Sequence, residues 1–222
     1  MIPVDLVYDY ETVGPAPNGA VVELSYTPFL DQPDNVPTFE ELVNKSRKYK
    51  FNVRKQIPKR ISDKGTIEWW KKQDPEAQKI LKALPDDLDL YDGMNQFFAD
   101  LKADGVDRWQ SFDYCRGPEF DRAILIDIVR QMHGKLDVFN EMPTVFWNSR
   151  DVRTAIENRL MVRGMTYTPL RRGILNGFIK HDSRHDCAKD VLMLIYAKRY
   201  AFGLEDAPEG DDIDPLSLPD KK

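Results

Sequence analysis

The sequence predicts an α/β fold, in which one domain has a central mixed β-sheet flanked by helices. Short apolar runs that fit strands alternate with longer amphipathic runs that fit helices. The first two strand-like runs are close enough in sequence to pair as a hairpin, which adds an antiparallel pair to the sheet. The chain shows no internal repeat and no linker. A single domain is therefore expected over residues 1–202, followed by an acidic, proline-rich tail at 203–222.

The first strand is predicted in the stretch Val4–Gly14, which ends in two carboxylates and a glycine turn. Alternate strand residues point to the same face, so Asp9 and Glu11 are expected to lie side by side. Two adjacent acids repel each other unless a cation lies between them, and Mg²⁺ prefers oxygen ligands. Strands also often end in solvated acids, so this pair alone leaves both interpretations open. The second strand is predicted over Ala20–Phe29.

A basic segment at 45–60 holds eight lysines and arginines and no acid. Between Lys48 and Arg54, apolar and basic residues alternate, which predicts a half-buried strand with a cationic outer face. This face is either an edge strand that lysines protect against aggregation or a stripe that contacts phosphates. Further strands are predicted at 108–115 and 144–147.

Helices are predicted where apolar residues recur at helical spacing and capping residues mark the ends. Asp74-Pro75-Glu76 is a good helix start, because it combines an acidic N-cap with proline at the first helical position. The preceding helix contains Trp69 and Trp70. Either both pack in the core, or one packs inwards and the other is partly exposed and able to stack on a base. The predicted helices span residues 63–73, 74–84, 90–103, 119–134, 150–162 and 187–202.

Acidic residues recur where strands end and helices begin. Asp9 and Glu11 end a strand, Asp121 opens a helix just after a strand, and Asp190 lies early in the last helix, five residues after His185. α/β folds assemble their sites at such places. Four carboxylates and one histidine suit hydrolysis of a phosphodiester with two metal ions. The histidine titrates near neutrality and can take a proton from water.

Three motifs in this set resemble the DEDDh 3′→5′ exonucleases, whose domain is ribonuclease H-like. Asp9–Gly14 matches Asp-x-Glu-Thr-x-Gly, Phe120-Asp121 resembles the second motif, and His185–Asp190 matches a His, four residues and an Asp. Each motif is weak alone, but three in the right order form the signature of the family. Similarity to a phage branch of this family extends over nearly the whole chain, including residues 66–70, 146–148, 150–151, 203–208 and 214–219.

The resemblance implies a role for each of these side chains. Asp9 would bridge two metal ions, while Glu11 and Asp190 would hold the ion on the side of the nucleophile. Asp121 would position the second ion, and His185 would be the general base. The implied ions are two Mg²⁺, with Mn²⁺ able to substitute.

The resemblance also implies contacts with substrate. Thr12 and Val13 would meet the 3′-terminal nucleotide, and Phe120 would wedge or support it. Of the two tryptophans, Trp70 is assigned to substrate binding. Arg116 stands where relatives often have asparagine, so it is expected either to contact a phosphate or to pair with a nearby acid.

The third motif allows two registers, because His181–Asp186 also fits a His, four residues and an Asp. We favour His185–Asp190. The small residue Cys187 then takes the position where the family usually has alanine, and apolar residues from Val191 continue the buried helix face. In this register Asp186 is explained as an acid at the start of a helix.

The net charge of −5 arises in the tail, because residues 203–222 hold seven acids and two lysines. A weakly acidic total does not exclude a nucleic-acid partner, since contacts depend on local patches. No apolar run approaches the ~20 residues that span a bilayer, and no secretory signal is visible. Two cysteines without disulfide or zinc spacing favour the cytoplasm, which is the host cytoplasm if a phage encodes the chain. The tail is expected to be extended or disordered.

These observations predict a metal-dependent 3′→5′ exonuclease that releases 5′-mononucleotides from single-stranded 3′ ends, DNA rather than RNA. One alternative is an exoribonuclease of the oligoribonuclease kind, because recognition of the 2′-OH depends on the shape of the pocket. Another is a nucleic-acid-binding module that has lost turnover. The complete set of acids argues against that module, which has no need of them.

Overall fold

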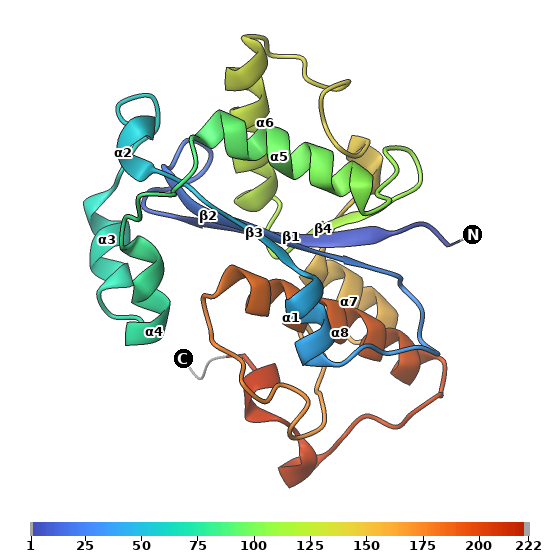
Figure 1. Ribbon diagram of the computed structural model, residues 1–222. Helices are drawn as coiled ribbons and strands as arrows, with labels where there is room; N and C mark the ends of the chain where they lie inside the picture. The colour runs from blue at the N-terminus through green and yellow to red at the C-terminus, as the bar shows by residue number, and fades with distance from the viewer. Residues whose placement is uncertain (1, 220–222) are drawn as a thin grey trace.

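The computed structural model describes residues 2–219, which form a five-stranded sheet in the order β3-β2-β1-β4-β5 (Figure 1). The central strand β1 (Asp5–Thr12) pairs antiparallel with β2 (Val21–Phe29) and parallel with β4 (Asp113–Cys115). The edge strand β3 (Arg47–Lys50) is antiparallel to β2, and the edge strand β5 (Ser149–Asp151) is parallel to β4. The predicted mixed sheet is confirmed.

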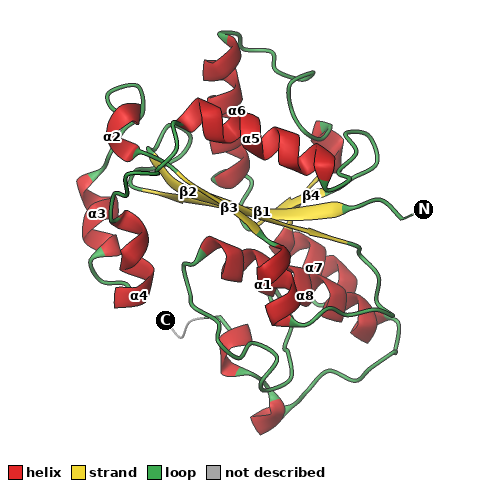
Figure 2. Ribbon diagram, in the orientation of Figure 1, coloured by secondary structure: helices red, strands yellow, loops and turns green. Residues whose placement is uncertain are grey.

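Helices cover both faces of the sheet, which lies as a single layer between them (Figure 2). One face carries α5 (Leu90–Ala103) and α6 (Asp121–His133). The other face carries α1 (Phe39–Lys45), α7 (Val152–Leu160) and α8 (Ser183–Ala201). None of the helices in the described part of the chain is both long enough and apolar enough to cross a membrane.

The alternation of side chains along β1 decides which helices meet the acids. Leu6, Tyr8 and Tyr10 pack into the core beneath α5 and α6, whereas Val7 packs into the core on the α8 side. Because strand side chains alternate with a period of two, Asp9 and Glu11 share the face of Val7. The acids at the end of β1 therefore face the N-terminal half of α8.

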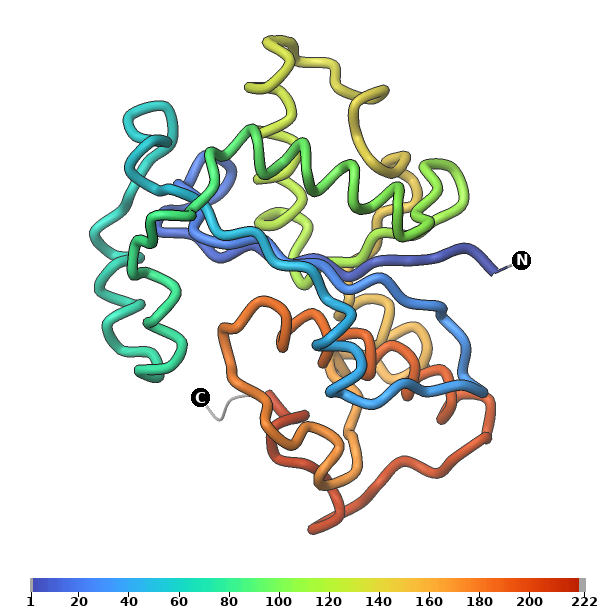
Figure 3. The backbone as a smooth tube through the Cα atoms, in the orientation of Figure 1, coloured from blue at the N-terminus to red at the C-terminus, as the bar shows by residue number. Residues whose placement is uncertain are grey.

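A helical arm extends beyond the end of the β1–β2 hairpin. It consists of α2 (Val53–Gln56), α3 (Lys64–Trp70) and α4 (Pro75–Gln78), and Figure 3 shows the chain leaving the sheet after β3 to form it. Trp70 and Val13 lie in a small separate core that joins this arm to the hairpin. One wall of the cleft described below comes from this arm.

The basic segment at 45–60 differs from the prediction. Its strand ends at Lys50, because the side chain of Asn52 accepts a hydrogen bond from Lys55 N and starts α2. The cationic face of the strand is neutralised within the protein, since Lys48 lies 3.0 Å from a carboxylate oxygen of Glu23. Two further cations on this strand pair in the same way, Arg47 with Asp104 and Lys50 with Asp87. These pairs favour the structural interpretation of the segment over the phosphate-binding one.

Other boundaries also shift. The strand predicted at 108–115 is confined to 113–115, because Asp107 accepts hydrogen bonds from the backbone of residues 109 and 110 and holds them in a turn. The strand predicted at 144–147 is wrong, since Phe146–Asn148 forms a 3₁₀ turn and β5 follows it. The helix predicted at 74–84 ends earlier and continues as the 3₁₀ turn Lys79–Leu81.

The acidic tail is not extended or disordered over its described part. It forms two 3₁₀ turns, Gly210–Asp212 and Pro215–Ser217, and returns to the body of the protein. Asp214 and Ser217 are buried there. The prediction for the last residues, 220–222, lies outside the described part of the chain.

Candidate active site

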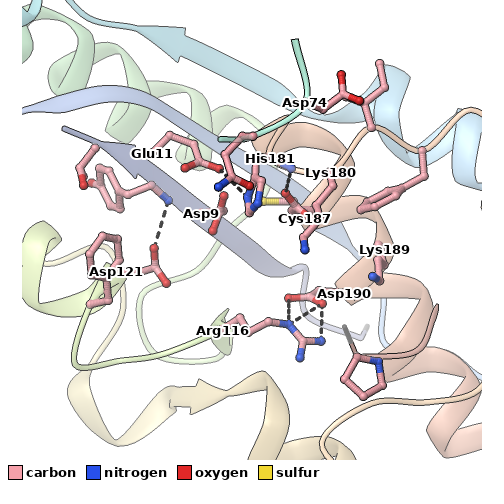
Figure 4. Close-up of a pocket in the computed structure, with 18 of the residues that line it drawn as sticks. Asp9, Glu11, Asp74, Arg116, Asp121, Lys180, His181, Cys187, Lys189 and Asp190 are labelled. Carbon is pink, nitrogen blue, oxygen red and sulfur yellow. Dashed lines mark hydrogen bonds and ion pairs between the residues drawn. The ribbon is translucent and has the colours of Figure 1, made fainter. Parts of the chain in front are cut away.

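Three carboxylates lie at the carboxyl end of β1. Asp9 and Glu11 project from the strand itself, and Asp121 is the first residue of α6 (Figure 4). The pairing of β1 with β4 ends at Val7, so the backbone N–H of Tyr10 has no strand partner on that side. This N–H donates to Asp121 Oδ1 at 3.1 Å, which ties the start of α6 to the strand. The two elements thus hold their acids in a fixed relation.

Two further side chains, His181 and Asp186, reach the end of β1 from the turn before α8 and from the start of α8. Together with Glu11 each offers a potential ligand atom, and these atoms lie within 4.8 Å of one another. His181 has a left-handed backbone (φ 65°), and its N–H donates to Asp186 Oδ2 at 2.8 Å. Its Nδ1 lies 3.9 Å from Glu11 Oε1. The turn therefore folds back on the first residues of α8 and aims the imidazole at the acids.

His185 is not brought into this group. Its Nδ1 accepts a hydrogen bond from Ile179 N at 2.9 Å, and its ring packs edge to face against Phe39 of α1, with the centroids 5.4 Å apart. Burial lowers the pKa of His185. Successive helix residues point about 100° apart, because a turn takes 3.6 residues. With Asp186 facing the cluster, its neighbour His185 must face α1 instead.

Asp190 lies one turn beyond Asp186 on the same face of α8, but its carboxylate is already paired. Arg116 Nε lies 3.0 Å from both oxygens of Asp190, and Arg116 Nη2 lies 2.6 Å from one of them. A further nitrogen of the guanidinium donates to Thr166 O. This two-pronged geometry is among the strongest ion pairs available to a carboxylate. Of the two expectations for Arg116, pairing with an acid is confirmed.

The electrostatics of the cluster indicate excess negative charge. Burial, followed by repulsion from neighbouring carboxylates, raises the pKa of Asp9 and of Glu11 well above the usual range. Burial raises the pKa of Asp121 to about 7, and burial with the charge of Asp190 raises the pKa of Asp186 to about 7. Each shift means that a negative charge at that position lacks compensation. The cluster has the chemistry that could hold a metal ion, since hard divalent cations prefer carboxylate oxygens.

The acids lie in a cleft of about 1420 Å³ that runs between the helical arm and α8. Thr12 and Phe120 line it, and Phe120 is 38% exposed. Their contacts with a nucleotide stay predictions. Val13 does not line the cleft, because it is buried in the core beneath the arm. Four cationic side chains also reach the cleft, namely Arg116, Arg153, Lys180 and Lys189.

The assignment of Trp70 to stacking on a base is wrong. Trp70 is only 1% exposed, and its indole N–H donates to Thr12 O at 2.8 Å, so it supports the wall of the cleft. Its neighbour Trp69 is 43% exposed, and its ring centroid lies 5.0 Å from that of His181. Trp69 therefore offers the free aromatic face. The sequence shows two adjacent tryptophans, but only the packing of the arm decides which ring turns inwards.

Comparison with known proteins gives the family. The domain family described as "3'-5' exoribonuclease Rv2179c-like domain" matches residues 4–194. The chain belongs to this family. It is also 46% identical over 225 residues to an exodeoxyribonuclease of Enterobacteria phage T4, covering 98% of this chain and 99% of that protein. The protein is an exonuclease, as the sequence predicted, and the alternative of a silent binding module is not supported.

Solved structures confirm the ribonuclease H-like exonuclease fold. The zinc-bound form of the E. coli ExoI–ssDNA complex matches with a TM-score of 0.50 at 14% identity, covering 91% of this chain and 41% of that one. Cell-death related nuclease 4 matches with a TM-score of 0.52 at 15% identity, covering 91% of this chain and 65% of that one.

Proposed function

We propose that this exonuclease removes 5′-mononucleotides from single-stranded 3′ ends with the help of two divalent cations. The observation that carries the proposal is that His181 and Asp186 meet Glu11 of β1 in one cleft, which Asp9 and Asp121 also line. In this assignment the carboxylates of Asp9, Glu11, Asp121 and Asp186 hold the ions. It replaces the register His185–Asp190 favoured by the sequence with His181–Asp186.

The donor set fits Mg²⁺ or Mn²⁺. All four ligand side chains are carboxylates, and oxygen donors are what these hard cations prefer. The raised pKa values of Asp121 and Asp186 support this fit, because a bound cation would offset the charge that burial disfavours. When bound, two such ions stabilise charge on the attacking and leaving oxygens and promote ionisation of water.

His181 is the general base in this proposal. An imidazole has an ordinary pKa of about 6.5, so it can accept the proton of the attacking water near neutral pH. The turn that carries it is fixed by the backbone N–H bond to Asp186, and its ring packs edge to face against Trp69. His185 is assigned a structural role instead, because its Nδ1 accepts from Ile179 N and its ring fills the contact with α1.

Asp190 is a positioning residue for Arg116. The pair fixes the guanidinium at the cleft wall, where it can meet a phosphate of the substrate. Phe120 and Thr12 lie on the same cleft and fit contacts with the 3′-terminal nucleotide. Trp69 supplies a stacking face close to the base that leaves.

DNA is the first candidate for the substrate, because the phage relative that matches over nearly its whole length is named an exodeoxyribonuclease. RNA is the second candidate, because the family that matches residues 4–194 is described as exoribonuclease-like. The carboxylates serve both, since discrimination depends on whether the cleft accommodates a 2′-OH.

The test uses 5′-labelled DNA and RNA oligomers of one sequence, incubated with the protein in Mg²⁺, in Mn²⁺ and in EDTA, and resolved on a denaturing gel. We expect a ladder that shortens from the 3′ end in either metal and intact label in EDTA, with DNA the faster substrate. Loss of the 5′ label as a mononucleotide would reverse the polarity. Cleavage in EDTA at the same rate as in Mg²⁺ would show that the reaction needs no divalent cation and would contradict the proposal.

A further inference from the structure

The C-terminal strap, defined here as residues 213–219, is built into the cleft although it is far in sequence from the acids. Five consecutive residues of the strap line the same cleft as Asp9 and Trp69, namely Pro215, Leu216, Ser217, Leu218 and Pro219. Figure 1 shows the C-terminal end of the described chain on the side of the sheet that carries α8. The cleft therefore has the helical arm as one wall and the strap as another.

The strap is anchored by a dense set of hydrogen bonds. Asp214 N donates to Leu170 O, and Asp214 Oδ2 accepts from Gly173 N at 3.1 Å. Ser217 Oγ accepts from Leu170 N and donates to Asp214 O. Both Asp214 and Ser217 are nearly inaccessible to solvent, at 4% and 1% exposure. Such a segment has a defined position, because displacing it would leave buried polar groups without partners.

Two arginines outside the cleft bind the segment of the tail that precedes the strap. Arg171 Nε pairs with Glu205 Oε1 at 2.9 Å, and Arg172 Nε donates to Asp211 O at 2.9 Å. Neither arginine lines the cleft. Glu205 and the backbone of Asp211 are thus engaged with the body of the protein, and four of the five strap residues that line the cleft are apolar.

We propose that the C-terminal strap is the base-side wall of the substrate cleft and selects single strands. Resting on the proposed function, the inference is that Leu216 and Leu218 contact bases of the strand upstream of the 3′ terminus. Leu216 and Leu218 are 45% and 37% exposed, and both lie on the cleft that holds the acids. Unpaired bases expose apolar faces that such side chains cover, whereas phosphates gain nothing from them.

The charge distribution across the cleft supports this orientation. The cations Lys180 and Lys189 lie on the cleft in and just before α8, and Lys189 Nζ lies 4.7 Å from the ring centroid of Phe178. Phosphates are drawn to the cationic side, so the bases turn towards the strap and Trp69. A duplex would have to bring a second phosphate backbone against the strap, whose five lining residues include four apolar side chains and no cation.

The test compares Leu216→Ala with Leu204→Ala. The two leucines are similarly exposed, at 45% and 47%, but Leu204 does not line the cleft. Binding of a fluorescein-labelled oligo-dT is measured by anisotropy in Ca²⁺. Turnover is measured with single-stranded DNA, with blunt duplex DNA and with the p-nitrophenyl ester of thymidine 5′-monophosphate, which is too small to span the cleft.

We expect Leu216→Ala to weaken oligo-dT binding and raise KM for single strands by about three- to ten-fold, with the small ester hydrolysed as by the wild type. The preference for single strands over duplex should fall, and Leu204→Ala should match the wild type throughout. Unchanged binding in Leu216→Ala, or faster cleavage of single strands, would overturn the inference. A wild-type protein without turnover would instead count against the proposed function, because the binding measurement in Ca²⁺ still reports on the strap.

Discussion

The site has two halves that are built differently. Asp9 and Glu11 stand on the central strand of the sheet, and Asp121 is tied to that strand through Tyr10 N. His181 and Asp186 come instead from a turn and the first residues of a helix. On the strand, the period of two fixes which side chains share a face. At the helix start, the direction of each side chain depends on where the helix begins. A shift of that start by one residue rotates every side chain by about 100°.

The largest expected effect sets the two halves against each other. Asp9→Asn on the strand and Asp186→Asn on the helix should each lower kcat by about 10³-fold or more, because each removes a charge needed to hold metal. Asp190→Asn should cost far less, since that carboxylate is already neutralised by Arg116. Steady-state cleavage of single-stranded DNA measures this. A full loss in Asp190→Asn with activity kept in Asp186→Asn would restore the register His185–Asp190.

The second effect concerns the two histidines. His181→Ala should lower kcat by about 10²- to 10⁴-fold with binding of oligo-dT retained, as expected for loss of a general base. His185→Ala should leave kcat within a few-fold and lower the free energy of unfolding, because its ring packs against Phe39. Turnover and urea unfolding of the two variants give the comparison. Equal loss of turnover in both would mean that packing at α1, not proton transfer, controls the site.

The third effect is a dependence of stability on pH. In the metal-free protein the pKa of Asp121 is about 7, above its ordinary value of 3.8, so the folded state binds this proton more tightly. The free energy of unfolding should therefore fall as pH rises from about 4 to about 7 and then level off. Asp121→Asn should remove roughly 2 kcal/mol or more of this fall. The side-chain oxygen of the asparagine can still accept the hydrogen bond from Tyr10 N, so this variant removes the charge of Asp121 and keeps its link to β1.

Urea unfolding in EDTA at pH 5 and pH 8 measures this dependence for the wild type and the variant. Added Mg²⁺ should stabilise the wild type more at pH 8 than at pH 5, because ions bind the deprotonated carboxylates. Parallel pH profiles for the two proteins would show that burial does not raise the pKa of Asp121.

The smallest effect on turnover concerns the tryptophans. Trp69→Ala should raise KM for single strands by roughly ten-fold and leave the free energy of unfolding within about 0.5 kcal/mol, since its ring is half exposed. Trp70→Phe should lower the free energy of unfolding and leave KM near the wild-type value, because it removes a buried indole and its hydrogen bond to Thr12 O. A KM that rises only in Trp70→Phe would assign the stacking face to the buried ring.

Much of the fold could be predicted from the sequence, because β1 and β2 carry long apolar runs with clear turn signals between them. Short strands were harder to place. β4 has three residues, and the preceding turn depends on a side-chain cap by Asp107 that no periodicity reveals. The tail looked disordered by composition, yet Asp214 and Ser217 make long-range hydrogen bonds that composition does not encode.

In the site, the strand acids and Asp121 were predictable, whereas the register at 181–190 was not. Two overlapping motifs fit the chain, and Asp186 and Asp190 share a helix face, so the apolar pattern of α8 could not separate them. One signal pointed to His181. Asp182 is a good N-cap residue, and in the structure its side chain accepts from Arg184 N, which places His181 just before the helix, in the turn that faces Glu11.

The hydrogen bond from Tyr10 N to Asp121 also makes one backbone amide a spectroscopic reporter. An amide proton that is donated to a carboxylate resonates differently according to whether the acceptor is charged, so the ¹H–¹⁵N signal of Tyr10 should titrate with Asp121. Because that amide sits in the central strand, it should also be among the slowest to exchange with deuterium. One resonance would then follow the charge of the site, the arrival of an ion and the integrity of the sheet.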